Sequence, residues 1–132
     1  MTRPRVVLPD DSQVILERVS QLLASDFDVV ATVSDGQATY DAVVALRPEA
    51  VVLDISMPLS TGLDVARRLC ALTDPPRIVF LTVHEGPEFL AAAQEAGALG
   101  YVLKRNAGSD LIRTLKQTLC GQPAFPERSD EP

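Results

Sequence analysis

Short apolar runs alternate along this chain with longer segments in which apolar residues recur every three or four positions. The runs lie at residues 6–8, 27–33, 50–53, 78–81 and 99–103. Runs of this length predict strands, and the spacing between them predicts amphipathic helices. Strands that each precede a helix form a βα repeat, whose right-handed crossovers place helices on both faces of a parallel sheet. The pattern therefore predicts an α/β domain with a doubly wound parallel sheet.

The composition of the individual runs separates central strands from an edge strand. Residues 50–53 and 78–81 contain no charged residue and no polar residue, which indicates burial on both faces of the sheet. Asp28 and Thr32 interrupt the run at 27–33, so we expect that strand to have a wetter side and to lie at an edge.

Proline, glycine and serine mark several expected helix ends. Pro48 is expected to end the second helix, and Pro87 to occupy the first turn of the fourth, which Gly97 then caps. Ser109 is expected to cap the last helix at its N-terminus. These signals set the lengths of the helices but assign no chemistry.

Length and composition indicate one folded domain. The chain has 132 residues, of which 46% are apolar and 23% charged, as is usual for globular proteins. After Gly121 the composition shifts towards proline and charged residues. We therefore expect residues 1–120 to form the domain and residues 121–132 to be a tail or the start of a linker.

Charge, hydropathy and cysteine content narrow the class of protein. Lys and Arg number 12 against 18 Asp and Glu, a formal net charge of −6, which argues against nucleic-acid contact by this domain. No apolar run approaches the roughly 20 residues of a membrane helix, so we expect no membrane contact and a cytoplasmic location. Cys70 and Cys120 are expected to be buried near helix ends rather than to form a disulfide framework.

Candidate site residues follow four of the five apolar runs. Asp10 and Asp11 come after the first run, Asp54 after the third, Thr82 after the fourth and Lys104 after the fifth. The carboxyl ends of parallel strands meet at one edge of a sheet, which is where ligands bind in such folds. We therefore expect three carboxylates, one hydroxyl and one ammonium group to converge in one shallow crevice.

Three carboxylates within a few ångströms repel one another and need a cation between them. The sequence has no cluster of histidine and cysteine to suit zinc, and an all-oxygen site of this kind suits Mg²⁺. Asp54 ends a central strand and is the best candidate nucleophile, whereas Asp10 and Asp11 are better placed as metal ligands. The ion, Thr82 and Lys104 could together hold the oxygens of a phosphoryl group.

Four motifs, in this order, resemble the receiver domain of two-component response regulators. They are Val7-Leu8-Pro9-Asp10-Asp11, Leu53-Asp54-Ile55-Ser56-Met57-Pro58 with Gly62, Leu81-Thr82, and Gly100-Tyr101-Val102-Leu103-Lys104. The resemblance covers residues 5 to about 120. Two further stretches are similar to the nitrate-regulator (LuxR-type) subgroup, whose receivers precede a helix-turn-helix DNA-binding domain: Leu81-Thr82-Val83-His84-Glu85 and Leu103-Lys104-Arg105.

The resemblance implies a flavodoxin-like (βα)5 fold with strand order 2-1-3-4-5, and it assigns roles within the crevice. Asp54 would be the phosphoacceptor, and Thr82 and Lys104 would contact the phosphoryl group. The implied Mg²⁺ ligands are Asp10, Asp11, Asp54 and the backbone carbonyl of Ser56. Thr82 and Tyr101 would switch together and alter the face formed by the fourth helix, fifth strand and fifth helix.

The resemblance also implies a cofactor and partners. The cofactor would be Mg²⁺, and the phosphodonor a phosphohistidine on a sensor histidine kinase or a small phosphodonor. The chain would be a signalling domain, not an enzyme, apart from self-catalysed phosphotransfer and dephosphorylation. Its output would be transcription through a C-terminal helix-turn-helix domain, which would make the DNA contact. A homodimer, through the first and fifth helices or through the switching face, is left open.

Each candidate site residue also has a simpler interpretation. Asp10 and Asp11 could cap the first helix, where acidic residues are favoured. Lys104 could be a solvated strand end. His84, the only histidine, is expected to be solvated in its loop. Alternatively, His84 and Ser56 flank the acyl phosphate and tune how water reaches it.

Other functions remain compatible with the same residues. A Mg²⁺-dependent phosphohydrolase would also use an aspartyl phosphate, although the position two after Asp54 is Ser56 and not the second acid that such enzymes use. A flavin or nucleotide carrier would need glycine-rich phosphate-binding loops, which are missing after the first and third strands. A stand-alone receiver acting by protein contact, and a degenerate receiver used as a scaffold, complete the alternatives.

Overall fold

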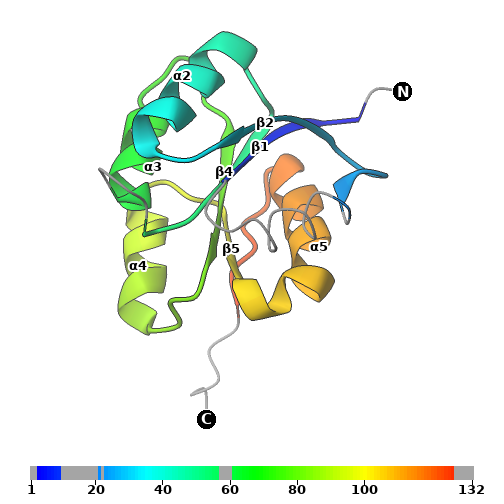
Figure 1. The fold of residues 1–132 in the computed structure, drawn as a ribbon. Helices are drawn as coiled ribbons and strands as arrows, with labels where there is room; N and C mark the ends of the chain where they lie inside the picture. The colour runs from blue at the N-terminus through cyan, green and yellow to red at the C-terminus, as the bar shows by residue number, and fades with distance from the viewer. Residues whose placement is uncertain (1–2, 10–20, 22, 57–60, 127–132) are drawn as a thin grey trace.

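The computed structural model describes residues 3–9, 21, 23–56 and 61–126, which form a five-stranded parallel sheet with helices on both faces (Figure 1). The strand order is β2-β1-β3-β4-β5 and every pair is parallel. The strands are β1 (Arg5–Pro9), β2 (Asp28–Val33), β3 (Ala50–Leu53), β4 (Arg77–Thr82) and β5 (Gly100–Leu103). The flavodoxin-like fold and its 2-1-3-4-5 order are thus confirmed.

Three described helices cover one face of the sheet and the last covers the other (Figure 1). The first three are α2 (Gly36–Leu46), α3 (Gly62–Cys70) and α4 (Pro87–Glu95), and the last is α5 (Ala107–Leu119), entered through the 3₁₀ turn η1 (Lys104–Asn106). Residues 10–20, where the sequence predicts the first helix, lie outside the described residues. In the described part of the chain, no helix has the length and apolar character needed to cross a membrane.

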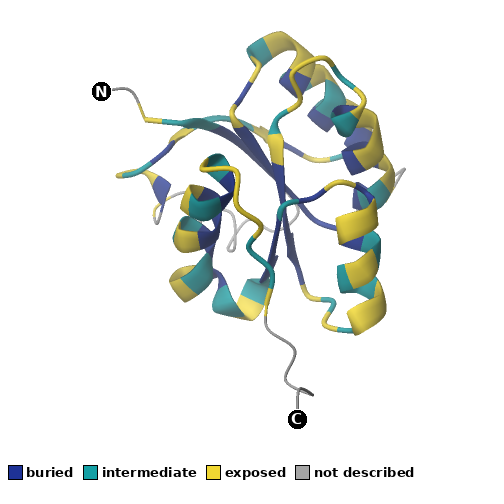
Figure 2. Cartoon of the chain, turned by 180° about the vertical axis from the view of Figure 1, so that it is seen from behind, coloured by how far each residue is buried: buried dark blue, intermediate teal, exposed yellow. Residues whose placement is uncertain are grey.

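The core lies in two layers, one on each side of the sheet, and the strands are its most buried part (Figure 2). All four residues of β3 are completely buried, with Val51 and Leu53 facing one layer and Ala50 and Val52 the other. β2 is largely half-buried and forms an edge of the sheet. The predicted contrast between a central strand and an edge strand is confirmed.

The helix ends follow local signals in most places. Asp35 caps the N-terminus of α2, and its carboxylate accepts a hydrogen bond of 2.8 Å from the amide of Ala38. α2 ends before Pro48, and Pro87 is the first residue of α4, as predicted. Gly97 follows α4 with a positive φ of 102°, the conformation of a glycine cap.

Two local predictions were wrong. α5 begins at Ala107, before Ser109, because the η1 turn has already brought the chain into helical conformation. Ser109 instead lies in the first turn and donates a hydrogen bond of 3.2 Å to the carbonyl of Asn106. Cys120 is exposed, since it follows the last turn of α5, whereas Cys70 at the end of α3 is half-buried and its pKa is raised by burial.

The chain does not leave the domain at the end of α5. It turns back and runs beside β5, where Ala124 forms a parallel bridge with Gly100 (Figure 1). The amide of Ala124 donates to the carbonyl of Leu99 at 2.7 Å, and the amide of Tyr101 donates to the carbonyl of Ala124 at 3.1 Å. The first part of the expected tail, to Pro126, therefore lies against the sheet.

Candidate functional site

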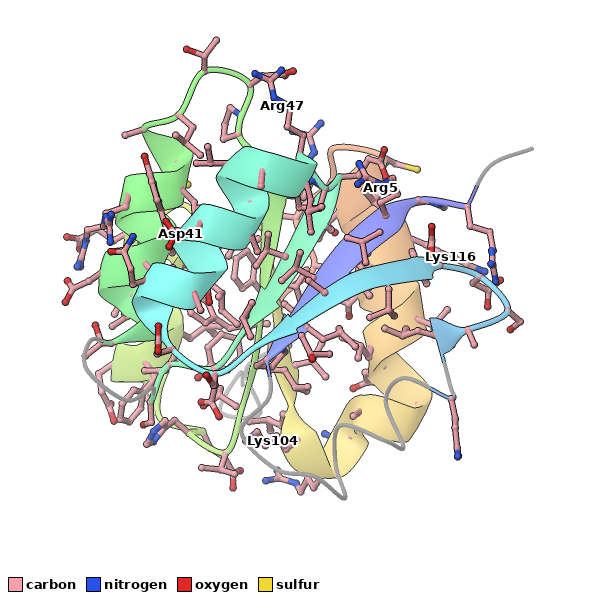
Figure 3. All side chains as sticks on the ribbon, turned by 45° about the horizontal axis from the view of Figure 1, so that its top comes forward. Arg5, Asp41, Arg47, Lys104 and Lys116 are labelled. Atoms are coloured by element: carbon pink, nitrogen blue, oxygen red, sulfur yellow. The ribbon has the colours of Figure 1, made fainter. Side chains whose placement is uncertain are left out.

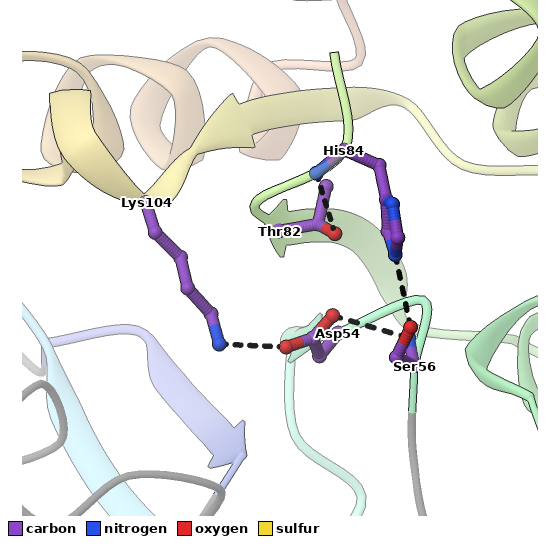
Figure 4. A network of polar contacts seen from close by, with 5 residues as sticks. All are labelled: Asp54, Ser56, Thr82, His84 and Lys104. Carbon is purple, nitrogen blue, oxygen red and sulfur yellow. Dashed lines mark hydrogen bonds and ion pairs between the residues drawn. The ribbon is translucent and has the colours of Figure 1, made fainter. Parts of the chain in front are cut away.

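Asp54 follows the last residue of β3 and projects a carboxylate into the carboxyl edge of the sheet (Figure 4). Its Oδ2 lies 2.7 Å from Nζ of Lys104, which follows β5, and its Oδ1 accepts a hydrogen bond of 3.1 Å from the amide of Ser56. The Asp54 and Lys104 side chains are only 6% and 12% exposed. A buried carboxylate is tolerated where both of its oxygens have such partners.

Gly62 fixes the backbone beneath this carboxylate. It is the first residue of α3, and its amide donates a hydrogen bond of 2.7 Å to the carbonyl of Ile55. A Cβ atom at this position would lie 2.0 Å from the carbonyl oxygen of Asp54. Only glycine lets the helix start this close to the strand end that presents Asp54.

Thr82 ends β4, the strand beside β3, and is completely buried. Its hydroxyl accepts a long hydrogen bond of 3.4 Å from the amide of His84 and belongs to the same polar network as Asp54 (Figure 4). The structure thus brings Asp54, Thr82 and Lys104 to one edge, as the strand-end argument predicts.

His84 is half-buried, so the expectation of a solvated side chain is met only in part. Its ring stacks on Phe89 with centroids 4.3 Å apart and planes at 19°, and its Nε2 lies 2.9 Å from Oγ of Ser56. The ring of Phe89 and the hydroxyl of Ser56 each cover part of the imidazole. The contact joins the loop after β3 to the loop after β4, in keeping with the alternative that pairs Ser56 with His84.

Tyr101 lies on β5 and is almost fully buried, with 4% of its surface exposed. Its hydroxyl donates a hydrogen bond of 2.7 Å to the carbonyl of His84, and its ring lies 6.5 Å from that of Phe80. Burial, followed by the charges of Asp54 and Glu88, raises the pKa of Tyr101 to about 12. The phenol is therefore protonated at neutral pH and can donate this bond.

The expected metal ligands are described only in part. Asp10 and Asp11 lie outside the described residues. β1 ends at Pro9, directly before them, and pairs with β3 in the same direction. Asp54 and Ser56 are the members of the expected ligand set that the structure describes, and both offer oxygen, the donor atom that Mg²⁺ prefers.

Comparison with known proteins identifies the family. The response regulator receiver domain matches residues 6–116. This chain belongs to that family. It is 35% identical over 115 residues to a positive alginate biosynthesis regulatory protein of Pseudomonas aeruginosa, covering 85% of this chain and 46% of that protein. It is 31% identical over 121 residues to the oxygen regulatory protein NreC of Staphylococcus epidermidis, covering 89% and 56%.

Solved structures agree on the receiver fold and on the subgroup. A LuxR-family two-component response regulator from Aurantimonas superposes with a TM-score of 0.87 at 30% identity, covering 93% of this chain and 89% of that one. The signal receiver domain of a response regulator named NarL from Mycobacterium tuberculosis gives a TM-score of 0.87 at 27% identity, covering 92% and 100%. The predicted kinship with NarL- and LuxR-type receivers is confirmed. This receiver spans about half the length of the curated relatives it matches.

Two contacts of this receiver escaped the sequence analysis. Phe89 supports His84, and the only hint was an aromatic residue in the first turn of α4. Arg105 forms a two-pronged ion pair with Glu85, with N–O distances of 2.6 and 2.8 Å. This contact lowers the pKa of Glu85 and raises the pKa of Arg105. The sequence hint for this ion pair was that Glu85 directly follows His84, and Arg105 directly follows Lys104, in the motifs.

Proposed function

We propose that this receiver accepts a phosphoryl group on Asp54 and changes its surface in response. The observation that supports the proposal is the buried Asp54 carboxylate at the end of a central strand, paired at 2.7 Å with Lys104 and in one network with Thr82. Membership of the receiver family supports it independently. The proposed donor is the phosphohistidine of a sensor histidine kinase.

In the proposed reaction, one Asp54 oxygen attacks the phosphorus atom of the donor. The phosphorus–nitrogen bond breaks, and its electron pair returns to the imidazole nitrogen, which takes a proton from water. The product is an acyl phosphate. Lys104 is positioned to balance charge on the phosphoryl oxygens, and the Ser56 amide holds the carboxylate in a fixed orientation. Attack of water on phosphorus would later release inorganic phosphate and restore Asp54.

We propose Asp10, Asp11, Asp54 and the backbone carbonyl of Ser56 as the Mg²⁺ ligands. The fit rests on the oxygen donors of Asp54 and Ser56 and on the acidic pair that follows β1 in the sequence. Bound Mg²⁺ would neutralise charge on the phosphoryl oxygens.

Thr82 and Tyr101 are the proposed switch. The Thr82 hydroxyl accepts a long bond of 3.4 Å from the amide of His84, and it can donate its own proton to a phosphoryl oxygen. The loop that follows Thr82 is tied to Tyr101 through the carbonyl of His84. A shift of Thr82 would therefore reach β5 and the face that α4, β5 and α5 form.

The proposed output is transcription. The relatives named above are regulatory proteins about twice as long as this chain. We propose that residues 1–120 are the receiver and that residues 121–132 begin a linker, the first part of which lies against β5. We also propose that a C-terminal helix-turn-helix domain contacts DNA in the full regulator. Homodimerisation through this domain is part of the same proposal. The domain itself would contact neither DNA nor membrane.

Intact mass measurement after incubation with acetyl phosphate and Mg²⁺ tests the proposal. We expect one phosphoryl group to add to the parent chain and none to Asp54→Asn. Asp64→Asn is the matched control, because it removes an exposed carboxylate on α3 and should leave the adduct unchanged. A phosphorylated Asp54→Asn chain would overturn the assignment, as would a parent chain that gains nothing from acetyl phosphate or a phosphorylated kinase.

A further inference from the structure

Residues 122–125, here called the C-terminal strap, cover the outer edge of β5. The amide of Ala124 donates to Leu99 at 2.7 Å, and the amide of Tyr101 donates to Ala124 at 3.1 Å. The side-chain amide of Gln117 in α5 donates to the carbonyl of Pro123 at 2.7 Å. The strap thus has fixed partners on both β5 and α5, and it supplies the hydrogen bonds that an edge strand otherwise lacks.

The strap also crosses from one layer of the domain to the other. α5 packs through Leu111 and Leu115 on the layer that contains Val102. Phe125, at the end of the strap, packs against the opposite layer, which contains Tyr101 and Ala93, the buried residue of α4. The strap therefore closes the open side of the sheet where α4, β5 and α5 meet (Figure 1).

Tyr101 is held from two directions in this arrangement. The strap binds its backbone amide, and the carbonyl of His84 binds its hydroxyl at 2.7 Å. The docked strap and the buried tyrosine ring occur in the same state of the molecule. Anything that stabilises one of them in that state also stabilises the other.

We propose that the C-terminal strap positions Tyr101 in its buried orientation, so that docking of the strap and occupation of the Asp54 site by a phosphoryl group favour each other. The second half of this statement rests on the proposed function. Coupling between two sites is reciprocal, so a loosened strap must weaken binding at Asp54 by the same factor by which an empty site loosens the strap. Ala124 and Phe125 are positioning residues, since they act through Tyr101.

The first arm of the test needs no phosphoryl group. The chain has two tyrosines and no tryptophan, so Tyr40→Phe leaves Tyr101 as the only fluorescent tyrosine. In that background, Ala124→Pro removes the amide that donates to Leu99, and Phe125→Ala removes the apolar anchor. Ala124→Val keeps the amide and is the matched control.

We expect acrylamide to quench Tyr101 more strongly in both strap variants than in the control. The Tyr101 amide should also exchange faster with deuterated solvent, because its acceptor on Ala124 is displaced. Circular dichroism identifies any variant that has unfolded, and Phe125→Ala is the milder change if Ala124→Pro fails. A Tyr101 that stays equally buried and equally protected in folded strap variants would overturn the proposal.

The second arm titrates beryllofluoride, a phosphoryl mimic, in the presence of Mg²⁺. We expect the strap variants to bind it roughly fivefold or more weakly than the Ala124→Val control, a coupling of ordinary size. Equal affinities would overturn the coupling. A parent chain that binds no beryllofluoride would overturn the coupling together with the proposed function. The first arm would still decide whether the strap positions Tyr101.

Discussion

Two Lys–Asp ion pairs lie at opposite ends of the sheet and differ in distance and in exposure. Figure 3 labels their lysines, Lys104 and Lys116. At the carboxyl end, Lys104 lies 2.7 Å from Asp54 and the side chains are 12% and 6% exposed. At the amino end, Lys116 lies 3.3 Å from Asp26 and the side chains are 59% and 37% exposed. An exposed pair contributes little because water screens it, whereas a buried pair costs desolvation that its attraction only partly offsets. The contribution of the buried pair to stability therefore gives little reason to bury Asp54 and Lys104. Their proposed role in phosphoryl transfer gives a better reason.

A cleft lies at the amino end of the sheet, away from the candidate site. It has a volume of about 550 Å³ and is lined among others by Arg47, Glu49, Asp74 and Arg77. The polar groups of the candidate site gather at the other end, on the loops after β3, β4 and β5. In a parallel sheet, ligands bind beyond the carboxyl ends of the strands, so the direction of the strands, and not the presence of a cleft at the other end, locates the candidate site.

Lys104→Met is expected to have the largest effect on stability, because it leaves the Asp54 carboxylate buried without its cation. We expect the free energy of unfolding to fall by about 3 kcal/mol at neutral pH without Mg²⁺. Lys116→Met removes the exposed counterpart and should cost less than about 1 kcal/mol. Urea unfolding measures both. Adding Asp54→Asn to Lys104→Met should recover part of the loss, and equal costs for the two lysines would break the comparison.

Gly62→Ala tests the backbone beneath Asp54. The added methyl group would meet the Asp54 carbonyl oxygen, so the start of α3 must shift, at an expected cost of about 2–3 kcal/mol. Phosphorylation by acetyl phosphate should slow as well, because Asp54 moves with its backbone. Gly108→Ala is the control, since a Cβ atom there has no neighbour within 4 Å. That change should stabilise α5 by roughly 0.5–1 kcal/mol in the same unfolding assay.

Mg²⁺ is expected to stabilise the carboxyl end through Asp54. At about one hundred times its dissociation constant, the ion should add about 2.7 kcal/mol to the free energy of unfolding. Thermal unfolding with and without Mg²⁺ measures the gain. The gain should shrink in Asp54→Asn and persist in Asp64→Asn. Equal gains in both variants would place the ion elsewhere.

The smallest expected effect is that of Tyr101 on stability. The direction of its pH dependence follows from the pKa of Tyr101. The folded chain raises that pKa from the ordinary 10 to about 12, so it binds the phenolic proton more tightly than the unfolded chain does. The resulting stability is complete below pH 10 and is lost as the pH rises to about 12. Tyr101→Phe should flatten this pH dependence and cost about 1 kcal/mol at neutral pH through the lost hydrogen bond. Tyr40→Phe, measured in parallel, should keep the slope.

The sequence was informative wherever burial leaves a periodic pattern. β3 was predicted at residues 50–53 and occurs there, because a strand covered on both faces has no polar residue. Thr82 and Lys104 were correctly placed at the same edge as Asp54, since strand direction alone brings their ends together. The roles of these residues, and those of Asp10 and Asp11, stay predictions.

The features that the sequence did not reveal depend on contacts that leave no periodic pattern in it. The stacking of His84 on Phe89 joins the loop after β4 to α4, and no periodic pattern in the sequence marks such a contact. Cys120 was expected to be buried, but it follows the last residue of α5, where the periodic pattern of the helix no longer applies, and it is exposed. The prolines after Gly121 are typical of a linker, yet Ala124 pairs with β5 because an open strand edge offers unpaired amide and carbonyl groups.

The parallel direction of the C-terminal strap has a consequence for any polypeptide that continues past Pro126. α5 ends at the amino side of the sheet, but the strap carries the backbone back alongside β5 towards the phosphoacceptor. A domain attached there would therefore start close to the switching face, at a high effective concentration. A short linker would be enough to bring it into contact with that face.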